Sequence, residues 1–170
     1  MLRHFEKALR LFPYSRLSKS ASVLRIYAVA FTEPVLLEQA LDPAPDVERL
    51  IGFAKQFQHA DCAYQLETCW DIWQYSDDWA VAPARVTIEC CGPEFEDGEA
   101  EHLRIDCGPD FQFLPDPEIP GSARIVQSNI RSLLKLAHDL DGALVAGSRQ
   151  LLSESGENFV ERLQQALTEL

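Results

Sequence analysis

Apolar residues at helical spacing open the chain. Positions 2–12 place four large apolar residues on one side of a helix and three basic residues on the other, and Pro13 ends the pattern. The apolar set is Leu2, Phe5, Leu9 and Phe12. Positions 1–12 are therefore predicted to form a basic amphipathic helix, followed by a polar linker over positions 15–22.

The next segments show mixed signals. Positions 22–32 are rich in β-branched and aromatic residues on both alternating faces, which indicates a strand covered on both sides for much of its length. Positions 33–41 are compatible with a short helix or with a second strand, and both alternatives stay open. Asp46 is a favourable N-cap, so a helix is predicted from Val47 to about Gln58.

Three segments in the middle of the chain alternate apolar and polar residues with a period of two. They cover positions 62–75, 85–91 and 102–107. Polar turns join them, and this combination is typical of an antiparallel meander with one wetter face. The middle of the chain is therefore predicted to be β structure.

Three prolines within positions 114–121 mark the passage to a helical C-terminal part. Apolar stripes predict one helix from Ser122 to about Leu140 and a last helix after Ser153. The whole pattern predicts an α+β fold, in which helices pack mainly on one face of an antiparallel sheet of about four or five strands. We expect a single domain over positions 1–170, mainly β at 22–118 and helical at 122–170.

The net charge of −12 is unevenly distributed along the chain. Positions 1–25 carry six basic residues and one acid, whereas positions 61–118 carry fifteen acids and two arginines, a local net charge of −13. Such a field repels nucleic-acid phosphates and anionic membranes and attracts basic partners. We therefore expect neither nucleic-acid nor membrane binding. The plainer interpretation of the acids is a solvated surface that maintains solubility.

Targeting and cofactor signals are missing from the sequence. The first twelve positions hold no secretory signal core, and no apolar run approaches the length of a membrane span. A cytoplasmic protein with reduced cysteines is the expectation. The cysteines and histidines form none of the usual zinc patterns, so no metal or other cofactor is predicted. The acidic run at positions 94–101 fits a hairpin turn at Asp97-Gly98 better than a calcium loop.

The least ordinary segment lies at positions 71–79, where aromatic and acidic residues gather. Trp73 and Tyr75 fall on the face opposite the apolar one, beside Asp71. Aromatic rings attract cations and anchor protein interfaces, so the segment suits a cationic side chain or a protein partner. Alternatively, the first helix or the second half of the chain covers these rings as core, since large aromatics are usually buried. The candidate binding residues are Asp71, Trp73, Tyr75, Asp77, Asp78 and Trp79, together with His102 and Arg104 from a later strand.

The strand at positions 102–107 offers a second chemistry. His102, Arg104 and Asp106 share one face and could supply a general base beside a carboxylate and an arginine. Cross-strand ion pairs on a solvated sheet face give the same pattern. A small-molecule enzyme that uses this face is therefore the alternative hypothesis, and no catalytic residue is assigned.

The leading hypothesis is a non-enzymatic binding or regulatory module that presents an acidic, tryptophan-containing sheet face to a basic protein partner. The basic helix at positions 1–12 is expected to pack on its own acidic domain or to exchange onto a second copy in a homodimer. No motif in the sequence carries the signature of a family of known function.

Overall fold

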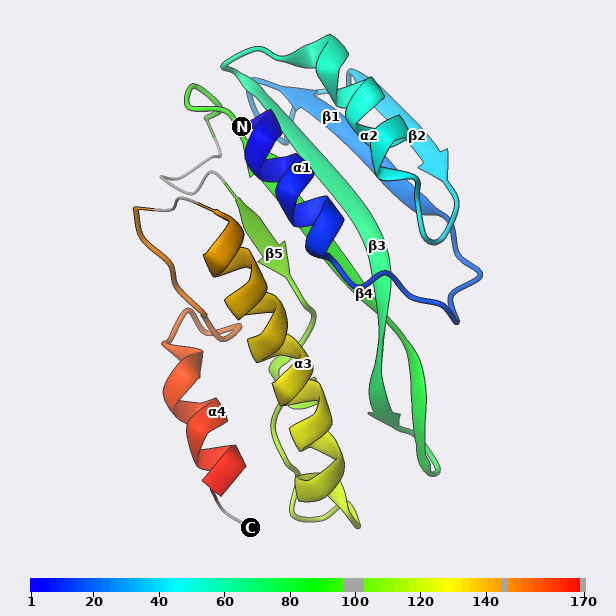
Figure 1. Cartoon of the computed structure of the whole chain (residues 1–170), viewed down its shortest axis with the longest axis vertical. Coiled ribbons are helices and arrows are strands. Elements are labelled where there is room, and N and C mark those ends of the chain that lie inside the picture. Colours follow the sequence, from blue (N-terminus) through cyan, green and yellow to red (C-terminus); the bar gives the residue numbers. More distant parts are fainter. Residues whose placement is uncertain (97–102, 145–146, 169–170) are drawn as a thin grey trace. The chain divides into compact units, whose positions relative to one another are not determined.

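The computed structural model describes residues 1–96, 103–144 and 147–168. Within this part of the chain it has four α-helices and a five-stranded antiparallel sheet, which confirms the α+β prediction. The elements are α1 (Leu2–Leu11), β1 (Ser22–Ala28), β2 (Leu37–Leu41), α2 (Val47–Ala54), β3 (Cys62–Tyr75), β4 (Trp79–Cys91), β5 (Arg104–Asp106), α3 (Ser122–Ala143) and α4 (Phe159–Thr168), with short 3-10 helices η1 (Lys55–Phe57) and η2 (Asp110–Gln112). Figure 1 shows the strands in the order β2-β1-β3-β4-β5.

The chain divides into two compact units, which are described separately. Unit 1 comprises Met1–Asp71 and Pro83–Cys107, and unit 2 comprises Ile72–Ala82 and Gly108–Leu170. The long strands β3 and β4 contribute residues to both units. The expectation of a single domain stays a prediction.

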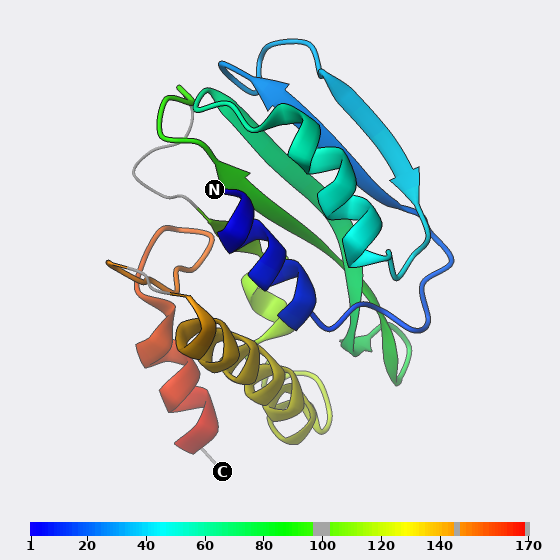
Figure 2. The same cartoon turned by 45° about the horizontal axis from the view of Figure 1, so that its top comes forward.

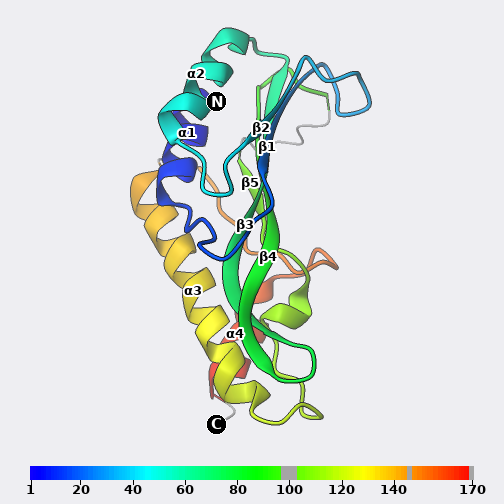
Figure 3. The ribbon, with the colours of Figure 1, turned by 90° about the vertical axis from the view of Figure 1, so that its right-hand side faces the viewer.

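Unit 1 has a core between one sheet face and the first two helices. Period-two alternation buries one side of each central strand, and α1 and α2 both cover that side (Figure 3). Phe5 of α1 lies 5.3 Å from the ring of Tyr64, and Phe12 lies 6.2 Å from Trp70. The apolar face of α1 thus packs within its own unit. Exchange of this helix between two copies stays a prediction.

Two elements in unit 1 differ from the expectation. β1 ends at Ala28 instead of position 32, and its side chains alternate between buried and half-buried, so it is not covered on both sides. Val29 follows with φ +70°, at the centre of a tight turn in which the Ala30 N–H donates to the Ala28 carbonyl. Residues 37–41 form the edge strand β2, which settles the helix-or-strand alternative.

The helix after Asp46 begins as predicted and ends earlier. The Asp46 side chain accepts a hydrogen bond from the Glu48 N–H at 2.9 Å, which confirms the N-cap. The α-helix stops at Ala54 and tightens into η1, so the predicted end near Gln58 was too late by about one turn.

Unit 2 comprises the tip of the β3–β4 hairpin together with η2, α3 and α4 (Figure 2). α3 and α4 bury apolar stripes, including Ile130 and Leu163. The segment before α4 and α4 itself contact η2, because the Asp110 side chain accepts hydrogen bonds from the Glu154 N–H and from Arg162. The helical C-terminal part predicted from residue 122 onward is present in this unit.

None of the helices in the described ranges is both long enough and apolar enough to cross a membrane. The predicted turn at Asp97-Gly98 and His102 lie outside the described residues.

Candidate functional site

The outer face of the hairpin tip in unit 2 carries an exposed apolar patch. Ile72 points into the core, so alternation turns Trp73 and Tyr75 to the opposite face. The rings of Tyr75 and Trp79 lie 5.4 Å apart, which puts Trp79 on the same face, and continuing the pairing by two residues places Val81 opposite Trp73. Trp73 is 36% exposed, Tyr75 41% and Val81 40%. We call these four side chains the aromatic patch.

A buried asparagine fixes the backbone beneath this patch. The Asn129 side-chain oxygen accepts a hydrogen bond from the Trp73 N–H at 2.9 Å, and its amide donates to the Trp73 carbonyl at 2.8 Å. The same amide also donates to the Gln112 carbonyl at 2.8 Å. Asn129 is 2% exposed and therefore takes the place of a neighbouring strand along this part of β3.

The indole of Trp79 is also held in place. Its N–H donates to the Pro120 carbonyl at 2.8 Å, so the proline-rich segment before α3 lies beside the aromatic patch. That segment carries two exposed acids, Asp116 and Glu118. The Asp116 backbone is itself anchored, because its N–H donates to the Ser122 hydroxyl at 2.8 Å.

The turn between β3 and β4 adds two exposed carboxylates. Asp77 and Asp78 occupy the turn, and the Asp78 carboxylate accepts a hydrogen bond from the Trp79 N–H at 2.8 Å. The charge of Asp78 therefore lies at the base of the Trp79 side chain. Together, the patch and its acids form a surface that is chemically suited to a cation, because ring faces and carboxylates both attract positive charge.

Two further candidate residues, Asp71 and Arg104, belong to unit 1 and have different surroundings. The Asp71 carboxylate accepts hydrogen bonds from the Ser15 hydroxyl and, at 2.8 Å, from the Arg16 N–H, so it anchors the linker after α1. Arg104 is exposed on β5, opposite Glu89. The structure thus gathers Trp73, Tyr75, Asp77, Asp78 and Trp79 in one place in unit 2 and leaves Asp71 and Arg104 outside it.

The outer sheet face of unit 1 carries cross-strand polar pairs. Arg25 contacts Glu38 at 2.7 Å and Glu67 at 2.8 Å, and Gln65 donates to Glu89 at 2.8 Å. Hydrogen bonding to Glu38, followed by that to Glu67, raises the pKa of Arg25. Glu67 and Glu89 on this face are therefore engaged with residues of neighbouring strands.

Three cysteines of unit 1 are buried in its core: Cys62, Cys90 and Cys91. All five cysteines are free thiols, and Cys90 is fully buried. Burial raises the pKa of Cys90 to about 12, so its thiol is neutral and unreactive near pH 7. In the described part of the chain, no three His, Cys, Asp or Glu side chains converge on a point that would hold a metal ion.

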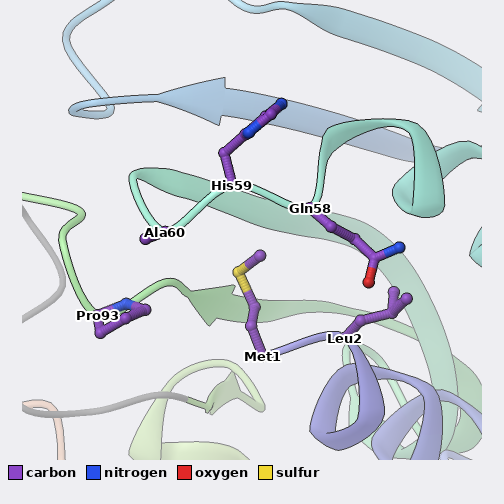
Figure 4. A pocket seen from close by; sticks show the side chains of 6 residues that line it. All are labelled: Met1, Leu2, Gln58, His59, Ala60 and Pro93. Carbon is purple, nitrogen blue, oxygen red and sulfur yellow. The ribbon is translucent and has the colours of Figure 1, made fainter.

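A shallow pocket of about 220 Å³ lies elsewhere in unit 1, between the start of α1 and the loops before β3 and after β4. Figure 4 shows its lining, in which the His59 ring points away from the Met1 side chain. Its other lining residues are Leu2, Gln58, Ala60 and Pro93. No candidate residue from the sequence lines this pocket.

The aromatic patch depends on three residues that sequence reasoning did not single out. Val81 completes the patch, while Pro120 and Asn129 hold it through hydrogen bonds. Asn129 left a readable signal, because it is a polar residue within the apolar stripe formed by Val126 and Ile130 on α3. The bond from Trp79 to Pro120 joins positions 41 residues apart and has no local signature.

Comparison with known proteins gives no functional guide. No family model, no curated protein and no solved structure matches this chain.

Proposed function

We propose that this chain is a non-enzymatic binding or regulatory module that presents the acidic, tryptophan-containing face of its β3–β4 hairpin to a basic protein partner. The observation that carries the proposal is the exposure of Trp73, Tyr75 and Val81 on one face beside the carboxylates of Asp77 and Asp78. Exposed aromatics with an acidic rim are typical of interface anchors for basic segments.

The support for this proposal lies in the way the patch is held. Asn129 fixes the Trp73 backbone and Pro120 fixes the Trp79 indole, so both aromatics are ordered before a partner arrives. An ordered surface loses little conformational freedom on binding, which favours affinity.

Charge supports the same class of partner. The chain has a net charge of −12, with the excess of acids concentrated over positions 61–118. This field speeds the approach of a basic partner and makes the association sensitive to salt. We also place the protein in the cytoplasm in this proposal, because five free thiols suit a reducing compartment.

An affinity capture from cells that naturally contain the protein tests the proposal. The wild type is compared with the double variant Trp73→Ala/Tyr75→Ala and with Phe111→Ala, which removes another exposed aromatic of unit 2. We expect a basic protein to be captured by wild type and Phe111→Ala, to be lost with the double variant, and to be released by raised salt. Equal capture by all three proteins, with folding verified by circular dichroism, would refute the proposed face.

A further inference from the structure

Two phenylalanine rings in this chain have an arginine close to their ring centres. Arg49 lies 5.9 Å from the ring centre of Phe53, and Arg162 lies 5.6 Å from that of Phe159. Over the described ranges, no arginine or lysine covers the rings of Trp73, Tyr75 or Trp79 in the same way. Indole and phenol rings attract cations more strongly than phenyl rings, so the better cation acceptors are the uncovered ones.

Exposed acidic residues lie on the segments that carry or contact these rings. Asp78 is bonded to the Trp79 backbone, whose ring contacts Tyr75. Asp116 and Glu118 lie on the proline-rich segment before α3, in which the Pro120 carbonyl accepts the hydrogen bond from the Trp79 indole N–H. A cationic group on the patch would therefore meet ring faces and, beside them, the Asp78 carboxylate, which is bonded to the Trp79 backbone.

Planarity distinguishes the two natural cationic side chains at such a surface. A guanidinium group is flat and weakly hydrated, so it stacks on a ring and also donates paired hydrogen bonds to a carboxylate. A lysine ammonium is compact and strongly hydrated, and it gains less from an aromatic face in contact with water. The combination of open rings with rim carboxylates therefore favours arginine over lysine.

We infer that the patch formed by Trp73, Tyr75, Trp79 and Val81 is an arginine-binding site, which takes the guanidinium of an extended arginine-bearing segment of a partner protein. This inference rests on the proposed function and specifies the chemistry of its partner. The arginine stacks on the exposed ring faces, Asp77 and Asp78 balance its charge, and Val81 contacts the aliphatic part of the side chain or a neighbouring residue of the segment.

Three synthetic peptides test the inference. One alternates glycine with arginine, the second replaces arginine by lysine, and the third replaces it by citrulline, which keeps the shape and loses the charge. Binding is measured by titration of the tryptophan fluorescence of the full chain. We expect the arginine peptide to bind about fivefold or more tightly than the lysine peptide, and the citrulline peptide to show no saturable binding.

Variants locate the site on the molecule. We expect Trp73→Ala/Tyr75→Ala to abolish arginine-peptide binding and Asp77→Asn/Asp78→Asn to weaken it by about fivefold, as for exposed ion pairs. Phe111→Ala serves as the matched control and should bind as the wild type does.

The outcomes separate the inference from the proposed function. The arginine and lysine peptides could bind with equal affinity, and both could lose binding in Trp73→Ala/Tyr75→Ala. That result would overturn the arginine preference but would still agree with a basic protein partner. Tight binding of the citrulline peptide would overturn it as well, because the charge would not matter. Failure of both charged peptides to bind would overturn the inference and the proposed function together.

Discussion

Replacing Asn129 by leucine should destabilise unit 2 far more than a typical helix substitution. Leucine has the same number and branching of side-chain heavy atoms as asparagine, with two methyl groups in place of the amide oxygen and nitrogen, so the change removes the hydrogen bonds and leaves no cavity. Three bonds are lost, at 2.8–2.9 Å, two with Trp73 and one with Gln112. Asn129 is 2% exposed, so water cannot readily replace it.

The magnitude follows from those contacts. Each hydrogen bond contributes about 1 kcal/mol net, and a buried polar group left without a partner costs about 1–3 kcal/mol. Since part of the strand edge regains water as it loosens, we expect Asn129→Leu to lower the free energy of unfolding by about 3–4 kcal/mol. A whole domain is stable by only about 5–15 kcal/mol, so this loss would be conspicuous.

Urea unfolding and hydrogen exchange measure the effect together. The Trp73 amide should exchange faster in Asn129→Leu than in the wild type, because its acceptor has been removed. Ser128→Ala, an exposed change one residue away on α3, is the control and should alter stability by less than about 0.5 kcal/mol. A change below that limit in Asn129→Leu, with unaltered exchange at Trp73, would refute the role given to Asn129.

Three further predictions concern unit 1. Val29→Gly should raise the free energy of unfolding by up to about 1 kcal/mol in urea unfolding, because a β-branched residue is strained at φ +70°; a loss would contradict this. Gly92→Ala should lower the free energy of unfolding by more than about 2 kcal/mol, since its Cβ would lie 2.2 Å from the Ala60 carbonyl oxygen. Gly52→Ala, with open space around it in α2, should raise the free energy of unfolding by up to about 1 kcal/mol. Equal effects of the two substitutions would be incompatible with this packing. Burial raises the pKa of Tyr64 above its unfolded value of about 10, so this tyrosine contributes stability below pH 10 that falls by up to about 1.4 kcal/mol per pH unit above it. Between pH 10 and 11, Tyr64→Phe should therefore lose less free energy of unfolding than the wild type. Equal losses in the two proteins would contradict the shift.

Local sequence patterns predicted the elements that have one buried face and one exposed face. Alternation defined β3 over Cys62–Tyr75, and Asp46 marked the start of α2. β4 was predicted to start at Arg85 and begins at Trp79, because alanines and Pro83 interrupt the alternation of its first half. β4 nevertheless extends back to Trp79, because its first half pairs with β3 across a short turn.

Long-range contacts explain the rest. β1 was predicted to be longer, and it ends where the Val29 N–H donates to the Asp61 carbonyl and the Val29 carbonyl accepts from the Glu96 N–H. Neither partner is local in sequence. The site shows the same division: alternation predicted the outward face of Trp73 and Tyr75, while the supports at Pro120 and Asn129 depend on tertiary contacts.

The three indole N–H resonances in a ¹H–¹⁵N spectrum test the binding face most directly. Trp70 is buried in unit 1 at 1% exposure, whereas Trp73 and Trp79 both belong to the aromatic patch. On titration with a peptide that contains both arginine and lysine, we expect the Trp73 and Trp79 indole signals to shift with one dissociation constant and the Trp70 signal to stay in place. Saturable binding of the peptide with the Trp73 and Trp79 signals unmoved would contradict the assignment of this face.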